Sequence, residues 1–258
     1  MKIWYQSTLS IDKDPIFYEY KETLKSHLNK VARPGTEVVV HGTEISSPFI
    51  ERSMYEELLH DRQIVDNVIQ AEREGYDAFS VGCMFDPAFY ALREVAKIPV
   101  SSMAETTMLL ACLLSPNFSL LASSREQLRR EIELVKRYGL EGRFIECEPM
   151  KTSLEELQRG FEDPRAVTEP AKEVAREAGK KGVCMFVNGC GCTNMVLAKH
   201  GIREIEGIPV LEGGGALIRM TEMLFDLKKM GINRSRLGFY TPMPEGNLLS
   251  LRKIYGFK

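Results

Sequence analysis

The chain has 258 residues, of which 44% are hydrophobic and 27% are charged, and its formal net charge at pH 7 is −2. This composition is typical of a globular protein, and the small net charge gives no electrostatic basis for nucleic acid or an acidic membrane as a partner. Six cysteines occur without a signal-peptide pattern or an apolar run of membrane-spanning length. We therefore expect reduced thiols, no membrane association and a cytoplasmic location.

Strands and helices alternate through the first part of the chain. Apolar, β-branched stretches predict the strands, and apolar residues at helical spacing predict the helices. The expected elements are a strand at Lys2–Gln6, a helix that Asp14 and Pro15 begin and that ends near Val31, a strand at Glu37–His41, a polar loop at 42–51, a helix at 61–74 and a strand at 78–81. This alternation is typical of a parallel sheet.

The second part of the chain repeats the alternation. Ser123 with Glu126, and Ser153 with Glu156, have the spacing of capping boxes and so predict helix starts. The other expected elements are strands at 118–122, 143–147, 183–187, Ile208–Leu211 and 237–240, and helices at 163–180, from Met195 onward and at 216–230. Pro170 is expected to break the helix at 163–180, and the glycines at 213–215 are expected to form a turn.

A cysteine lies where the strand at 183–187 gives way to a helix. Gly191-Cys192-Thr193 follows the strand, and the helical pattern begins at Met195. The first N–H groups of a helix have no partner within it, and the helix dipole favours negative charge there. The sequence therefore predicts that the Cys192 thiol ionises more easily than a free thiol.

The same order of elements occurs around Cys83. The strand at 78–81 ends in Gly82-Cys83, Asp86-Pro87 opens a helix, and Ile-Pro-Val follows at 98–100, as it does at 208–210 in the other copy. Such internal duplication indicates two related units. We predict an α/β fold of two pseudo-symmetric lobes, each a parallel-type sheet flanked by helices, with the active site in the cleft between them. Lobe 1 is expected to comprise 1–105 and 212–258, and lobe 2 to comprise 106–211.

These segments resemble the hydantoin racemase branch of the aspartate/glutamate racemase superfamily. The resemblance rests on Ile50-Glu51, Gly75-Tyr76-Asp77-Ala78-Phe79, Cys83 with Asp86-Pro87, Gly191-Cys192-Thr193 and the two Ile-Pro-Val segments. It implies two lobes, no cofactor, a small-molecule substrate, an assembly of identical subunits, and inversion of a carbon acid by two thiols, those of Cys83 and Cys192. Phe85 stands where the branch usually has Gly, and Thr193-Asn194 where it usually has Ala-Gly. Hydantoin-like substrates therefore rank first and amino acids second.

Inversion of an acidic stereocentre needs one group to remove a proton from one face and another to return one to the opposite face. A thiolate and a thiol can share these roles, provided that preorganised donors stabilise the carbanion. The backbone N–H groups of Cys83, Met84, Thr193 and Asn194 are candidates for those donors. The residues expected to bind substrate are Gln6, Ser7, Met84, Ser123, Gly191, Thr193 and Asn194.

Other interpretations remain open at this point. Related enzymes decarboxylate a malonate or isomerise a cis-diacid, with one or both cysteines. Cys184, Cys190 and Cys192 with Cys83 could bind a metal, although their spacing is unusual for zinc and we expect no metal. Cys190 could pack at the strand end, respond to oxidation, or itself be the partner of Cys83. Cys112, Cys147 and Cys184 are expected in the core, and Asp86 is expected to cap the helix that Pro87 opens.

Overall fold

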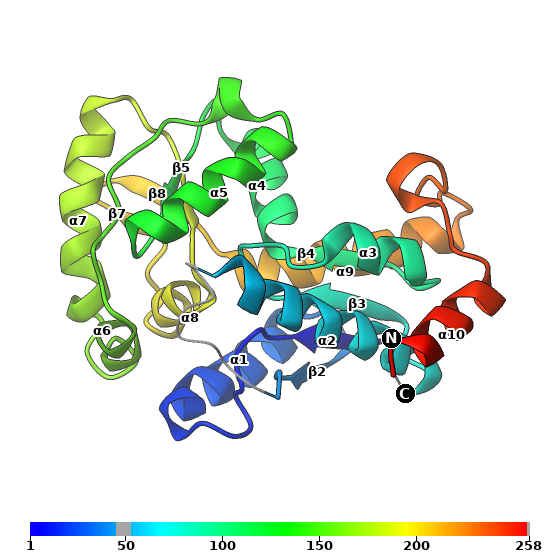
Figure 1. Cartoon of the computed structure of the whole chain (residues 1–258). Helices are drawn as coiled ribbons and strands as arrows, with labels where there is room; N and C mark the ends of the chain where they lie inside the picture. Colours follow the sequence, from blue (N-terminus) through cyan, green and yellow to red (C-terminus); the bar gives the residue numbers. More distant parts are fainter. Residues whose placement is uncertain (45–52, 257–258) are drawn as a thin grey trace.

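The computed structural model describes residues 1–44 and 53–256 (Figure 1). Most of the expected loop at 42–51, and the Ile50-Glu51 segment of the resemblance, lie outside the described residues. The described chain forms two α/β lobes, each built on its own four-stranded sheet. Among these residues, no helix is both long and apolar enough to cross a membrane.

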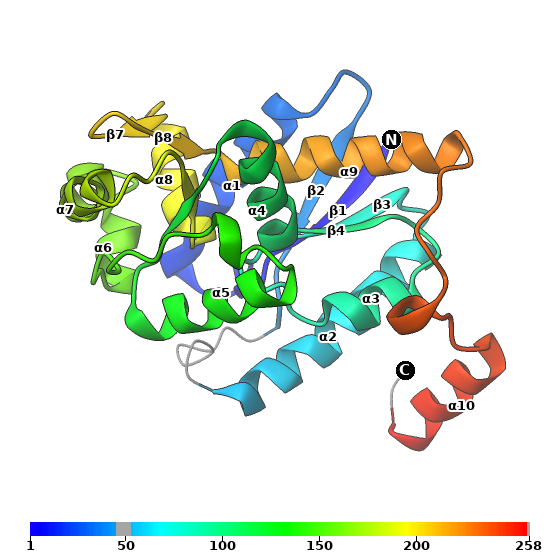
Figure 2. The same ribbon diagram turned by 90° about the horizontal axis from the view of Figure 1, so that it is seen from above.

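The first sheet is parallel throughout and has the order β2-β1-β3-β4. Its strands are β1 (Lys2–Gln6), β2 (Glu37–His41), β3 (Ala78–Val81) and β4 (Val100–Ser102). Figure 2 shows one pair of helices on each face of this sheet: α1 (Tyr18–Val31) and α9 (Gly213–Lys229), and opposite them α2 (Met54–Arg73) and α3 (Phe89–Val95). Alternate residues of β1 serve the two faces, because Tyr5 packs in the cluster with α1 whereas Trp4 packs in the cluster with α2 and α3.

The second sheet has the order β5-β6-β8-β7, with β7 alone antiparallel. Its strands are β5 (Ser119–Leu121), β6 (Phe186–Asn188), β7 (Glu204–Ile205) and β8 (Ile208–Leu211). The helices of this half are α4 (Met103–Leu114), α5 (Arg125–Arg137), α6 (Leu154–Arg159), α7 (Arg165–Lys180) and α8 (Gly191–Lys199). Shorter or terminal elements are η1 (Pro15–Phe17), η2 (Glu141–Arg143), η3 (Gly238–Tyr240) and α10 (Glu245–Ile254).

The two lobes share buried apolar side chains. One hydrophobic cluster runs from α1 and β1 through α4 to β5, α7 and α8, and a second lies between the first sheet and α2 with α3. After β8 the chain returns to the first lobe, where α9 packs against β3 and β4. All strands of the first sheet fall within 1–105 and all strands of the second within 106–211, although that proposed boundary lies inside α4.

Several expected elements differ in the structure. Helix α2 begins at Met54 rather than 61, because the Ser53 side chain caps it by accepting the Glu56 N–H. The expected strand at 143–147 is wrong: the segment makes a single bridge, Phe118 to Phe144, and then runs beside β5 as irregular chain. The expected strand at 237–240 is also wrong, since η3 occupies it, and α10 follows without having been predicted.

Two segments that were expected to interrupt helices are helical, because side-chain packing stabilises one and a side-chain cap stabilises the other. Helix α7 continues through Pro170, with Val167 and Ala171 buried on either side of it. The glycines at 213–215 form the first turn of α9 rather than a loop turn. The Glu212 side chain caps that turn by accepting the N–H groups of Gly214 and Gly215. A Cβ on Gly215 would lie 2.4 Å from the Glu212 carboxylate, so a larger residue there would displace this capping side chain.

Candidate active site

Both cysteine turns border one cavity of about 280 Å³ between the lobes. The first turn follows β3 and carries Cys83, and the second follows β6 and carries Cys190 and Cys192. The described residues that line the cavity are Ser7, Thr8, Leu9, Tyr20, Gly82, Cys83, Met84, Phe85, Ser123, Gln127, Thr152, Leu154, Glu155, Leu157, Gly189, Cys190, Gly191 and Cys192. The carboxyl ends of parallel strands thus supply the site, as is usual in α/β folds.

Two glycines allow the two cysteine turns to approach each other. A Cβ on Gly82 would lie 2.0 Å from the Tyr5 hydroxyl oxygen, and one on Gly191 would lie 3.0 Å from the Tyr20 hydroxyl oxygen. That same Gly191 position is 3.6 Å from the Gly82 carbonyl oxygen, so the turns are neighbours across the cleft. The buried Tyr5 ring leaves no room for a side chain at Gly82, whereas the contact of Gly191 with Tyr20 is tight but needs only a small shift.

The Cys83 turn is held in an unusual backbone conformation. Asp86 and Ala88 have φ angles of 44° and 53°, in the left-handed region that non-glycine residues seldom adopt. The Phe85 N–H points to the Cys83 sulfur at 3.5 Å, and the Thr8 side chain also hydrogen-bonds with this thiol. Burial nevertheless raises the pKa of Cys83 to about 12.

Cys192 lies inside the first turn of α8, not before the helix as expected. Cys190 is the N-cap residue, and the first bond of the helix runs from the Asn194 N–H to the Cys190 carbonyl oxygen at 3.0 Å. The predicted role of the Asn194 N–H as a donor to substrate is therefore wrong. The N–H groups of Gly191, Cys192 and Thr193 precede that bond and are the ones that a helix start offers to an anion.

The Cys192 thiol is enclosed and hydrogen-bonded. It accepts from the Gln158 amide nitrogen at 3.5 Å and lies beside the thiol of Cys190. The hydrogen bond with Cys190 and burial raise its pKa well above the usual range, while Gln158 opposes that rise. Both thiols are therefore neutral at pH 7. The expectation that the helix start eases ionisation of Cys192 is wrong here, because burial disfavours the charged form.

A buried carboxylate, that of Asp86, ties the Cys83 turn to both lobes. Asp86 accepts hydrogen bonds from the N–H groups of Ala104 and Glu105, at 2.9 and 2.8 Å, and from the hydroxyls of Ser102 and Tyr138. The first three donors lie at the β4–α4 junction, and Tyr138 follows α5 in the second lobe. The prediction that Asp86 caps the helix opened by Pro87 is therefore wrong: it caps α4. Burial raises the pKa of this carboxyl.

Four of the residues predicted to bind substrate line the cavity, and three do not. Ser7, Met84, Ser123 and Gly191 line it. The other three lie behind its wall and are Gln6, Thr193 and Asn194.

Two of these three side chains, those of Gln6 and Asn194, form structural hydrogen bonds, whereas the Thr193 hydroxyl is buried without a partner among the described residues. The Gln6 amide donates to the carbonyl oxygens of Ser7 and Gly42 and accepts from Trp4 and Asn67. Such contacts fix the end of β1. Asn194 in turn bonds Asn188, Glu212 and Gly213, and so joins β6 to the start of α9.

The irregular segment beside β5 contributes a residue that sequence patterns did not reveal. The Met150 and Thr152 N–H groups donate to the carbonyl oxygens of Ala122 and Ser123, which brings Thr152 to the cavity. The Thr152 hydroxyl oxygen is buried and has no hydrogen-bond partner within the described part of the chain. It is therefore available to a ligand. No sequence motif precedes Thr152. The expected strand at 143–147, which the structure does not contain, gave no reason to place Thr152 at the cavity.

The remaining cysteines occupy different environments. Cys147 is buried and Cys112 half-buried, but Cys184 is exposed and hydrogen-bonds the Gly182 carbonyl oxygen, so its expected core position is wrong. Cys184 follows the end of α7 and does not line the cavity that contains Cys83, Cys190 and Cys192. Within residues 1–44 and 53–256, no three His, Cys, Asp or Glu side chains are arranged to hold a metal ion.

The chain is similar to known racemases. A sequence model of the family described as Asp/Glu/Hydantoin racemase matches residues 18–221, a range that includes both cysteine turns. The hydantoin racemase of Pseudomonas sp. (strain NS671) is 28% identical over 198 residues, which is 77% of this chain and 78% of that protein. The hydantoin racemase of Paenarthrobacter aurescens is 26% identical over 230 residues, 85% of this chain and 93% of that protein.

A solved structure extends the similarity to the fold. The allantoin racemase from Klebsiella pneumoniae aligns with a TM-score of 0.78 and 23% identity over 95% of this chain and 94% of that one. The fold of this chain therefore has a counterpart among solved structures.

Proposed function

The chain belongs to the Asp/Glu/hydantoin racemase family, in its hydantoin racemase branch, and we propose that it is a cofactor-independent racemase that inverts C5 of a 5-substituted hydantoin. In this proposal the thiols of Cys83 and Cys192 act on opposite faces of the substrate. One observation carries the proposal: both cysteines line a single cavity whose described lining contains no Lys, Arg or His.

That lining favours a neutral ring over a free amino acid or a diacid. Two carboxylates, or an ammonium with a carboxylate, usually require oppositely charged side chains when they leave water. Glu155 is the one charged residue of the described lining, and the start of α8 can receive one developing negative charge. A hydantoin ring is neutral until its C5 proton is removed. It therefore matches a cavity that has no cationic side chain in its described lining and one helix start for a developing negative charge.

The walls also offer space for an apolar substituent. Leu9, Phe85, Leu154 and Leu157 line the cavity together with the polar Ser123 and Thr152. We propose that the ring polar groups pair with the hydroxyls and that the C5 substituent lies on the leucines. Phe85 stands at the position where the branch usually has Gly, and it narrows the space beside Cys83.

The proposed reaction uses one thiolate and one thiol. The thiolate removes the C5 proton, the electron pair spreads onto the adjacent carbonyl oxygen, and the opposite thiol returns a proton to the other face. The N–H groups of Gly191 and Cys192, which line the cavity at the start of α8, are suited to stabilise that oxygen. A thiol with a raised pKa is a stronger base once ionised, although a smaller fraction is ionised at neutral pH.

The test is a substrate comparison in deuterated water without added cofactor. Single enantiomers of 5-benzylhydantoin, allantoin (which carries a ureido group on C5) and phenylalanine are incubated with the protein. Loss of optical rotation and deuterium at the former C–H are then followed. We expect racemisation with deuterium uptake for 5-benzylhydantoin, less for allantoin and least for phenylalanine. A release of carbon dioxide from a malonate, with no racemisation of any hydantoin, would replace the proposal with the decarboxylase alternative.

Two further properties stay predictions. An assembly of identical subunits is supported by exposed apolar side chains on the first turns of α2, namely Met54, Tyr55, Leu58 and Leu59. A cytoplasmic location is supported by the six unpaired cysteines. Light scattering of the purified protein and fractionation of its native cells would test the two properties.

A further inference from the structure

A second cavity, of about 370 Å³, lies on the first lobe away from the cysteines. Its lining comes from the end of α3, the loop that leads to β4, the last turns of α9, and the segment 232–240 that follows α9. Figure 2 labels α3, β4 and α9. None of its lining residues lines the cysteine cavity. Its volume falls within the range of small-molecule sites in proteins.

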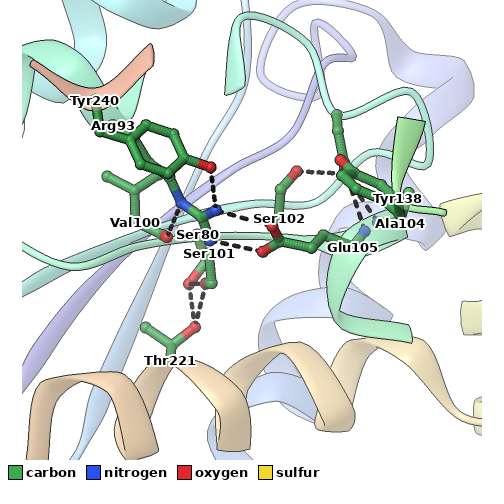
Figure 3. Close-up of polar contacts among 11 residues, drawn as sticks. Ser80, Arg93, Val100, Ser101, Ser102, Ala104, Glu105, Tyr138, Thr221 and Tyr240 are labelled. Atoms are coloured by element: carbon green, nitrogen blue, oxygen red, sulfur yellow. Dashed lines mark hydrogen bonds and ion pairs between the residues drawn. The ribbon is translucent and has the colours of Figure 1, made fainter. Parts of the chain in front are cut away.

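The polar wall of this second cavity is cationic. Its charged side chains are Arg93, Lys97, Lys228, Arg234 and Arg236, and no described lining residue is Asp or Glu. Two carboxylates lie near the cavity but outside its lining, and the charge of Glu72 acts on Arg234 without a direct ion pair. Glu105 forms a two-pronged ion pair with Arg93 (Figure 3), and Glu72 accepts the N–H groups of Lys97 and Ile98.

Two arginines of this wall carry charge that no described carboxylate pairs directly. Arg234 donates to the Ala96 carbonyl oxygen, and Arg236 donates to the carbonyl oxygens of Arg93 and Ala96 at 3.4 and 3.3 Å. These acceptors are neutral, and a guanidinium has five donors, so both groups retain capacity for an anion. Burial, together with the charges of Arg236 and Arg93, lowers the pKa of Arg234 to about 10. Arg234 therefore stays charged at pH 7, close to other positive charges.

The same cavity also has an apolar surface. Its apolar lining residues are Ile98, Pro99, Val100, Leu224, Leu227 and Ile232. A fully solvated inorganic ion gains little from such a surface, whereas an aromatic or aliphatic body gains free energy in proportion to the apolar area that it removes from water. The combination of a cationic rim and an apolar wall matches an organic anion.

We propose that this second cavity binds a small organic monoanion, whose carboxylate pairs with Arg234 and Arg236 and whose apolar body lies on Leu224 and Leu227. The site is separate from the racemase site, and its existence does not depend on the reaction that the cysteines catalyse.

The experiment measures binding of phenylacetate to the whole protein by titration calorimetry. Phenylacetamide is the neutral probe of the same shape, and inorganic phosphate is the anion without an apolar body. We expect saturable binding of phenylacetate and binding at least about tenfold weaker for both other probes, because a charge-assisted hydrogen bond and the apolar contact each contribute on that scale. Raising the salt concentration should weaken phenylacetate binding.

Variants locate the site. Arg234→Gln should weaken phenylacetate binding by about tenfold, and the Arg234→Gln/Arg236→Gln double variant by more. Lys229→Gln, which removes a positive charge at the end of α9 but outside the cavity lining, is the control and should bind like the parent. Cys83→Ser/Cys192→Ser should also bind like the parent, which separates this site from the cysteine cavity. If the double variant fails to fold, Arg234→Gln alone decides the question.

The proposal fails if phenylacetate does not bind at concentrations on the order of 10 mM, or if Arg234→Gln binds it unchanged. Equal affinity for phenylacetamide would show that the cations play no part, and equal affinity for phosphate would show that the apolar wall plays none. Loss of binding in Cys83→Ser/Cys192→Ser would place phenylacetate in the cysteine cavity and would also overturn the proposal.

Discussion

The two cysteine turns share an order of elements but not an environment. After β3, Cys83 is followed by left-handed residues, and α3 begins only at Phe89, whereas Cys192 already lies in the first turn of α8. Cys83 is therefore held by a loop that Asp86 anchors to both lobes. Cys192 is held by a helix, with an accompanying thiol at its N-cap.

This difference shows that duplication placed two thiols on one cavity without making them equivalent. The hydrogen bonds that favour the ionised form come from Phe85 and Thr8 for Cys83, and from Gln158 for Cys192. The helix N–H groups lie on the Cys192 side only. A symmetric reaction, which interconverts two mirror-image molecules, would therefore proceed in an asymmetric site, and each thiol can be tested by itself.

The largest expected effect follows removal of either thiol. Cys83→Ser and Cys192→Ser should each lower racemisation of 5-benzylhydantoin by about 10²–10⁴-fold, the usual contribution of a general acid–base. Each variant retains one base, so each should still exchange the C5 proton for deuterium, but from opposite enantiomers. Proton NMR of each pure enantiomer in deuterated water measures this.

Cys190→Ser is the matched control, since Cys190 borders the same cavity. It should keep racemisation within about tenfold of the parent, as expected for a group that acts only through its neighbour. If Cys190→Ser is as damaging as Cys192→Ser, while Cys192→Ser still racemises, the catalytic role belongs to Cys190.

The second effect concerns thiol ionisation and compares Cys83 with the exposed Cys184. Because burial raises the pKa of Cys83 to about 12, its thiolate fraction is smaller than that of an ordinary thiol at every pH below that value. Alkylation of Cys83 by iodoacetamide should be slow at pH 7 and should still rise about tenfold per pH unit above pH 9, where an ordinary thiol levels off.

Peptide mass spectrometry from pH 6 to 10 gives both alkylation rates in one sample, with Cys184 as the internal reference. A plateau for Cys83 near pH 8 would contradict the raised pKa. The raised pKa of Cys83 also makes stability depend on pH. The thiol loses its proton at a lower pH in the unfolded chain than in the folded protein. The contribution of Cys83 to the free energy of unfolding is therefore present below about pH 8.5 and declines above it.

The third prediction compares the loss of stability caused by an alanine substitution at the glycine of each cysteine turn. Gly82→Ala should lower the free energy of unfolding by about 1–3 kcal/mol, because its methyl group would meet the fully buried ring of Tyr5. Gly191→Ala should cost less than about 1 kcal/mol, since only a shift of a few tenths of an ångström from the Tyr20 hydroxyl is required. Guanidinium unfolding measures both, and equal values for the two variants would contradict this packing.

The sequence predicted the two lobes and the shared cavity because those follow from local patterns. A strand that ends in Gly-Cys can be recognised in isolation, and parallel strands bring such ends to one edge of a sheet. The sequence did not predict the hydrogen-bond partners of the Asp86 carboxylate, since an Asp followed by Pro has the local pattern of a helix N-cap. Only the fold brings Ala104 and Tyr138 to that carboxylate. The sequence also did not reveal Thr152, because this residue lies in an irregular segment, where apolar residues follow neither the helical nor the strand period.

The smallest effect concerns the side chains that hydrogen-bond the two thiols. Thr8→Val removes a partner of Cys83, and Gln158→Leu removes one of Cys192. Both partners lower the thiol pKa, so each variant should raise the pKa of one thiol and slow racemisation by about fivefold, the equivalent of a hydrogen bond of about 1 kcal/mol. Alkylation should slow at the affected cysteine only.

Rates alone cannot reveal which enantiomer each variant affects. The two enantiomers have equal free energy in solution, so kcat/KM must be the same in both directions for any variant. The deuterium isotope effect on kcat/KM, in contrast, can differ between the two enantiomers. If Gln158→Leu slows proton removal by Cys192, the deuterium effect on kcat/KM should increase for the C5-deuterated enantiomer that faces Cys192, and Thr8→Val should increase it for the mirror image. An equal change for both enantiomers in both variants would mean that the two thiols do not act on opposite faces, and that the asymmetry of the two turns has no part in the reaction.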